Sequence, residues 1–193
     1  MSAKRYSRRA LVSLAIGAAG SLAAYSVLPR WAVAEGADDA ELLQRFEYLS
    51  ANGNSNCSGA FMYSIWTMPP EARLRGSCCA PMDAHVYVEQ VKALRAYAHI
   101  GEIPPDPYDI EAGLARVLME QYGRELTPAQ QAAYDYAMEH SNERGPCCCG
   151  CWRWYVYGGL AKHLIRRRGV DGPQVAAIWD LSSGCGGAQH HHG

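Results

Sequence analysis

The eight cysteines of this chain constrain its fold more than any other feature. All of them lie between residues 57 and 185, in four separate places. Cysteines that are neighbours in sequence rarely meet the Cα separation and dihedral angle that a disulfide needs. Each group must therefore find partners in a distant loop or converge with the others on a shared ligand. The groups are Cys57 alone, Cys78 with Cys79, Cys147 with Cys148, Cys149 and Cys151, and Cys185 alone.

Between these groups, apolar residues recur every three or four positions, which is the pattern of amphipathic helices. Thr127-Pro128-Ala129-Gln130 has the residues of a capping box with proline at the first helical position. Pro69-Pro70 must end a short second helix. The predicted helices begin at Asp38–Asp39, near Phe61, at Asp83, at Pro107, at Thr127, at Trp152 (ending at Arg168) and at Pro173 (ending near Leu181).

No stretch alternates apolar and polar residues as a half-buried strand would. We therefore expect an all-α fold, a compact helical bundle of about six or seven helices. The length suits one domain with a sizeable core. The apolar positions of the first, second and fourth helices are Leu42, Leu43, Phe46 and Leu49; Phe61, Ile65 and Trp66; and Ile110, Leu114, Val117 and Leu118.

The N-terminal segment has the three parts of an export signal. Ser7-Arg8-Arg9-Ala10-Leu11-Val12 resembles the twin-arginine export consensus. An apolar run follows from Leu11 to Leu28, and Ala32-Val33-Ala34 is the small-x-small pattern that a signal peptidase recognises. We expect cleavage after Ala34. The alternative is a membrane anchor, since the run is about long enough to span a bilayer.

The expected organisation is a twin-arginine-type signal peptide (1–34) and a cysteine-rich helical domain with a short Gly/His-rich tail (35–193). The protein would then be exported to the periplasm or the outside of a bacterial cell. Five of the 18 Lys and Arg residues lie in 1–34, which leaves 13 against 19 Asp and Glu, a formal charge of −6. An acidic surface argues against nucleic acid as a partner. No second apolar run is long enough to cross a membrane.

The spacing of the cysteines favours metal binding. Cys147 to Cys149 form a C-x-C and Cys148 to Cys151 a C-x-x-C, spacings that let two thiolates bind one ion, with Gly150 expected to supply a tight turn. Thiolates select soft or borderline ions: copper, zinc, mercury or an iron–sulfur cluster. If the groups share an ion, their sulfurs should lie about 3.5–4 Å apart, because each would be about 2.3 Å from the metal.

The segment Gly145 to Cys151 resembles a family of exported bacterial proteins named for a Pro-Cys-Tyr-Cys-Gly-Cys motif. Five of six motif positions match, and Cys148 stands where the family has tyrosine. Trp179-Asp180 followed by Cys185-Gly186 is similar to the C-terminal part of that family. The resemblance implies an exported thiol protein. The functional positions that it carries over are Cys147, Cys149, Cys151 and Cys185.

Histidines offer further ligands. His85 lies six residues after Cys79 and is a candidate ligand, although a lone histidine in such a place is more often a surface or capping residue. His190-His191-His192 could form a metal-capturing tail or a disordered end. The candidate metal ligands are Cys57, Cys78, Cys79, Cys147, Cys148, Cys149, Cys151, Cys185 and His85.

Three functions follow from these patterns. The first is an exported protein that binds a soft metal ion as a buffer, scavenger or donor, with a metal-delivery or redox protein as partner. The second is a helical interaction protein with four structural disulfides, which an even cysteine count allows. The third is a thiol–disulfide oxidoreductase using Cys148 and Cys151, although no strands for the usual βαβ setting are predicted. Common catalytic motifs are absent from the sequence, so an enzyme is the less favoured reading.

Overall fold

The structure is a computed structural model that describes residues 30–186, and side chains from residue 38 onward. The described chain is predominantly helical, which confirms the expected all-α class. Most of the predicted export signal and the three C-terminal histidines lie outside the described residues. The elements are α1 (Arg30–Ala51), α2 (Gly59–Ile65), β1 (Arg73–Arg75), α3 (Ala84–Leu94), the 3-10 helix η1 (Arg95–Tyr97), β2 (Asp109–Glu111), α4 (Ala112–Tyr122), α5 (Pro128–His140), α6 (Trp152–Arg168) and α7 (Gly172–Leu181).

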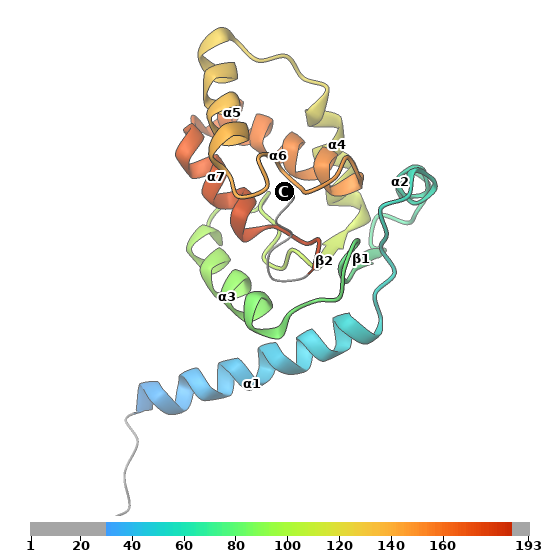
Figure 1. The fold of residues 1–193 in the computed structure, drawn as a ribbon, viewed down its shortest axis with the longest axis vertical. Coiled ribbons are helices and arrows are strands. Elements are labelled where there is room, and N and C mark those ends of the chain that lie inside the picture. Colours follow the sequence, from blue (N-terminus) through green and yellow to red (C-terminus); the bar gives the residue numbers. More distant parts are fainter. Residues whose placement is uncertain (1–29, 187–193) are drawn as a thin grey trace, which may run out of the picture.

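The helices pack in pairs over two clusters of buried apolar side chains, a large one and a smaller one between α1 and α3. Helix α4 packs against α6, and α5 packs against α7, while α1 lies along one side of the molecule against α3 (Figure 1). Helix α6 contributes the central buried side chains, among them Trp152, Val156 and Leu160. It also carries Gly159, where a Cβ would overlap the backbone carbonyl of Leu118 on α4. The close crossing of α4 and α6 therefore depends on a residue without a side chain.

Helix starts agree with the capping residues. Asp83 accepts a hydrogen bond from the backbone N–H of Val86 and begins α3. The capping box of Thr127 and Gln130 is present at α5. An equivalent box, which was not predicted, begins α7 at Asp171. Each cap satisfies backbone N–H groups that lack a partner within the helix.

The start of the first helix was wrongly predicted. Helix α1 is continuous from Arg30, so Asp38 and Asp39 lie within it and do not cap it. Both carboxylates instead reach across to the α3–η1 segment, Asp38 to Arg95 and Asp39 to Lys92. Those ion pairs explain why two acidic residues occur at this point of an apolar pattern.

The fourth helix begins later than predicted. Residues from Pro107 do not open a helix; Asp109–Glu111 form β2, which pairs antiparallel with β1 so that Leu74 lies opposite Ile110. Both of these apolar side chains are buried. The buried Asp109 carboxylate accepts from the guanidinium groups of Arg73 and Arg45. Pairing across the chain thus outweighs the local helical spacing, and α4 begins only at Ala112.

Three residues that were assigned to inner helix faces are exposed. Leu43 and Trp66 are each 43% exposed and Val117 is 54% exposed, whereas Leu49 on α1 and Ile65 at the end of α2 are fully buried. The second helix also ends at Ile65, before the two prolines. Short amphipathic helices bury a narrow stripe, so residues beside it remain exposed. Within residues 30–186, no helix is both long and apolar enough to cross a membrane.

Candidate metal centre

All eight cysteines, from four loops, converge in one place. Cys57 lies just before α2, the 78–79 pair lies between β1 and α3, and Cys185 follows α7. Residues 147–149 lie between α5 and α6, and Cys151 is the N-cap of α6. The metal-binding hypothesis required such a convergence, whereas the sequence alone also allowed the groups to pair separately. A hydrogen bond with Cys147 lowers the pKa of Cys151, but its hydrogen bond with Cys78 and its burial raise that pKa to about 12, so the dipole of α6 does not by itself make Cys151 a thiolate.

The sulfur–sulfur distances match the spacing of ligands around shared ions. Thiolates bound tetrahedrally about 2.3 Å from one ion lie about 3.8 Å apart. Six pairs are close to that value: Cys57–Cys149 at 3.6 Å, Cys78–Cys79, Cys79–Cys149 and Cys147–Cys151 at 3.7 Å, Cys79–Cys148 at 3.8 Å and Cys78–Cys151 at 3.9 Å. Three pairs are nearer, at 2.9 Å: Cys57–Cys79, Cys147–Cys185 and Cys148–Cys185. All eight are free cysteines.

The cluster has a buried side and an open side. Cys147, Cys151 and Cys185 are each no more than 3% exposed. Cys78 is half-buried and contacts this group, and the four together are the inner set. The outer set lies nearer to solvent; Cys79 is exposed, and the other three are half-buried. The outer set consists of Cys57, Cys79, Cys148 and Cys149.

Two loops of the cluster are joined by backbone hydrogen bonds. The carbonyl of Cys185 accepts from the backbone N–H of Ala80 at 2.9 Å and of Cys79 at 3.3 Å. The neighbouring carbonyl of Ser183 accepts from the side chain of Gln90 on α3 at 2.9 Å. The segment that carries Cys185 is therefore fixed against both the 78–79 loop and α3.

Two glycines beside Cys185 allow this close approach. A Cβ on Gly184 would overlap the guanidinium of Arg153, and one on Gly186, which has φ of +78°, would overlap the carbonyl of Ala80. The expected role of Gly150 is not seen. Gly150 is not among the positive-φ residues, and a Cβ there would meet open space. The tight approach is made at residues 184–186, not within the 147–151 loop.

Arg153 is a fully buried cation beside the cluster and was not among the predicted site residues. It donates to the backbone carbonyls of Pro107 and, at 2.8 Å, of Gly76. Its guanidinium stacks over the ring of Trp152, 4.5 Å from the centroid. Arg153 is one turn before Tyr157 on an otherwise apolar face. A single charged residue on an apolar helix face could have been identified from the sequence as a candidate, because a buried arginine needs hydrogen-bond partners.

Nearby charge and hydrogen bonding shift the pKa values of the thiols in different directions. Hydrogen bonds from Cys147, Cys151 and Cys185 lower the pKa of Cys78, and the nearby Arg153 lowers it further. The pKa of Cys147 is raised, because it donates to Cys151, Cys185 and Cys78. Burial raises the pKa of Cys57. Adjacent thiolates repel, so the cluster cannot hold all its charges without cations.

His85 does not join the cluster. Its side chain is 81% exposed and lies 3.3 Å from Glu89, one turn along α3. Among the described residues, each group of three or more side chains suited to one metal ion consists of cysteines alone. A purely sulfur ligand set selects soft ions over magnesium or calcium. The cysteine cluster can hold a metal ion.

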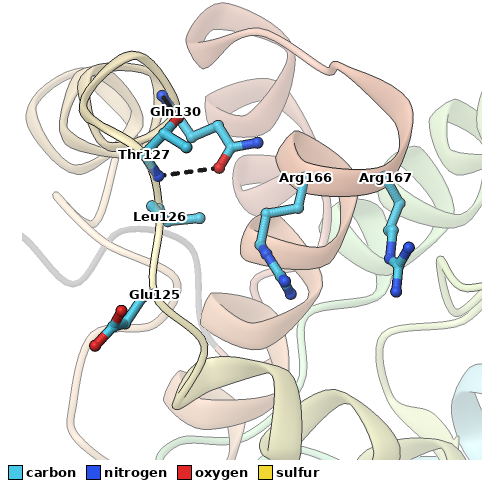
Figure 2. Close-up of a pocket in the computed structure, with 6 residues that line it drawn as sticks. All are labelled: Glu125, Leu126, Thr127, Gln130, Arg166 and Arg167. Atoms are coloured by element: carbon cyan, nitrogen blue, oxygen red, sulfur yellow. Dashed lines mark hydrogen bonds between the residues drawn. The ribbon is translucent and has the colours of Figure 1, made fainter.

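The described part of the chain also has an open pocket at the far end of α6. Its lining includes Thr127, Gln130, Arg166 and Arg167. Figure 2 shows the backbone N–H of Thr127 donating to Oε1 of Gln130 at the wall of this pocket. These residues cap α5 and end α6, so local helix structure accounts for them. The reactive side chains lie at the opposite end of α6.

Comparison with protein-family models, with curated proteins and with solved structures found no match to this chain.

Proposed function

We propose that this protein is an exported, cysteine-rich protein that binds a soft metal ion, such as copper, zinc or mercury, as a buffer, scavenger or donor. The observation that carries the proposal is the meeting of eight sulfurs from four loops, six pairs of them 3.6–3.9 Å apart. Distant loops have no reason to place so many thiols together unless a shared ligand or a bond joins them.

Export belongs to the same proposal. The twin-arginine-type residues near position 8 and the short Pro-Cys-x-Cys-Gly-Cys match at 146–151 support it. The twin-arginine route moves proteins that are already folded. A metal ion could therefore enter the cluster in the cytoplasm and leave the cell with the protein.

The test is metal analysis of protein purified anaerobically from its own host. We expect a stoichiometric soft metal that is lost when Cys147, Cys149 and Cys151 are replaced together by serine. His85→Ala is the matched control and should keep the full metal content. Metal-free wild-type protein that also fails to take up copper(I) or zinc when reduced would overturn the proposal.

The second candidate is an interaction protein held together by four disulfides. The sulfur–sulfur distances predict which cysteines would pair. Among the sulfur pairs within 3.9 Å, one set of four uses every cysteine once and joins no sequence neighbours. That set also keeps the inner and outer sets apart. It is Cys57–Cys149, Cys79–Cys148, Cys78–Cys151 and Cys147–Cys185. Peptide mapping of protein alkylated at harvest distinguishes the candidates: four intact disulfides with this pairing favour the second, and eight alkylated thiols favour metal binding.

A further inference from the structure

We infer that the cluster is polynuclear and has two levels: the inner set retains ions, and the outer set exchanges them with an incoming thiolate ligand. The inference rests on the proposed function and specifies how that site would work. It concerns the number of ions and their route, neither of which follows from metal binding alone.

The first half of the inference, that the cluster binds several ions, rests on sulfurs that belong to more than one possible metal site. Five groups of three sulfurs, each within 4.8 Å of one another, fit within the eight residues. Seven cysteines belong to two of these groups, and Cys148 belongs to one. A sulfur that belongs to two groups is placed to bridge two ions. The cluster is thus arranged for several ions joined by bridging thiolates, whereas two independent sites would divide the sulfurs without sharing.

Charge supports the same conclusion. Eight thiolates would carry eight negative charges in a site whose inner side is excluded from water, and the fully buried Arg153 offsets one. Separating so much like charge from solvent is costly unless it is neutralised. One divalent ion leaves most of it uncompensated. Several ions offset more of it, and a bridging thiolate can bind two of them.

The difference in burial between the two sets supports the second half of the inference, that the outer set exchanges ions and the inner set retains them. The inner sulfurs Cys147, Cys151 and Cys185 lie behind the outer ones, while Cys79 is exposed. Contacts cross between the sets at Cys78–Cys79, 3.7 Å, and Cys148–Cys185, 2.9 Å. An ion can therefore pass from an outer to an inner sulfur without leaving the cluster.

Exchange with a partner is a ligand substitution. The partner's thiolate forms a bond to an outer ion as the bond from that ion to Cys79 breaks. The released Cys79 thiolate takes up a proton from water. No electron is transferred, so the ion keeps its oxidation state.

The first test is the stoichiometry of the reduced, full-length protein with copper(I) supplied anaerobically as a bicinchoninate complex. Three or more tightly bound ions per chain are expected, because eight sulfurs bind three trigonal ions only if some are shared. A chain that binds one or two ions overturns the inference but leaves the proposed function standing. A chain that binds none overturns both.

The second test follows copper(I) removal by excess chelator. The wild type should release copper in two phases whose rates differ at least tenfold. Cys79→Ser should lose most of the fast phase and keep the slow one. His85→Ala, outside the cluster, should match the wild type. Release in one phase, or equal loss of both phases in Cys79→Ser, would contradict the two-level arrangement. These readouts do not require any buried cysteine to be replaced.

Discussion

Arg153 joins the cysteine cluster to the segments on either side of the β1–β2 pair. One guanidinium nitrogen donates to Gly76, at the end of β1, and another to Pro107, before β2, so a single side chain fixes the segments that lead to Cys78 and to β2. Its position next to the α6 N-cap places its charge beside the inner sulfurs. Arginine suits this site because its planar group donates in several directions at once.

Replacing Arg153 with lysine should destabilise the fold although the charge is retained. Lysine is a point donor and would leave one of the two buried carbonyls without a partner, a loss of about 2 kcal/mol in the free energy of unfolding. Urea unfolding of the metal-free protein measures this loss. Arg168→Lys is the control, because Arg168 is 41% exposed and pairs with Glu102 at the surface. If the two variants lose the same stability, Arg153 does not have this structural role.

Gly184 is the other residue whose replacement should affect the cluster. A methyl group there would overlap the Arg153 guanidinium, so Gly184→Ala should cost about 2 kcal/mol of stability, as overpacking does. It should also lower the copper(I) capacity, because Cys185 would move away from the inner set. Gly150→Ala, in the cysteine loop but facing open space, should change neither quantity. The reverse ranking would show that the turn is made at Gly150.

Among the elements, α1 is held to the rest of the fold by surface ion pairs as well as by apolar contact. Asp38 accepts two hydrogen bonds from Arg95, at 2.7 and 2.8 Å, and so joins α1 to η1. The Arg95 guanidinium lowers the pKa of Asp38 below its ordinary value of 3.8. Docking of α1 should therefore weaken in acid.

The pH dependence has a definite sign. A lowered carboxyl pKa stabilises the fold above the unfolded-state pKa, and this stabilisation is lost as pH falls through the folded-state pKa. Asp38→Asn should therefore be less stable than the wild type at about pH 6, with a smaller difference at about pH 3, below the ordinary pKa of 3.8. Urea unfolding at the two pH values measures it. A difference that stays constant with pH would mean that Asp38 acts through something other than its charge.

Elements with strong local signals could be predicted from the sequence. The Asp83 cap, the Thr127 capping box and the span of α6 all follow from short-range chemistry. Elements that depend on a distant partner could not. The Ile110 region reads as helix because its spacing is helical, yet it pairs with β1 and its buried Asp109 binds two arginines.

The candidate site, like the fold, could be predicted from the sequence only in part. The cysteine groups and their loop positions were visible in the sequence, because thiols concentrated at helix ends are unusual. The structure adds that all four groups meet. His85 was included for its nearness along the chain, but the direction of its side chain on α3 takes it into solvent. The roles of Gly184 and Gly186 depend on chain crossings that no local pattern encodes.

At the scale of the whole molecule, the cluster is where four loops of an all-α fold are held together. Apart from the backbone bonds from Cys185 to residues 79 and 80, many of the contacts among these loops are between sulfurs. A metal ion that binds the folded chain and not the unfolded one adds its binding free energy to stability. The fold and the cluster should therefore stabilise one another.

Metal removal should lower the melting temperature and loosen the loops locally. At copper(I) one hundred times above the dissociation constant, binding adds about 2.7 kcal/mol, which corresponds to about 5–10 °C for a domain of this size. Hydrogen exchange should show the loss first at the backbone N–H of Ala80, which donates to Cys185. Exchange at the C-terminal end of α6, about four turns beyond Cys151, serves as the internal control. Equal melting temperatures with and without metal would contradict the coupling.

X-ray absorption at the metal edge of the anaerobically loaded protein shows which atoms bind the ion. We expect sulfur ligands alone, at about 2.3 Å from the metal, as thiolates require. Nitrogen or oxygen ligands would contradict this expectation, because the eight cysteines would then not be the ligands.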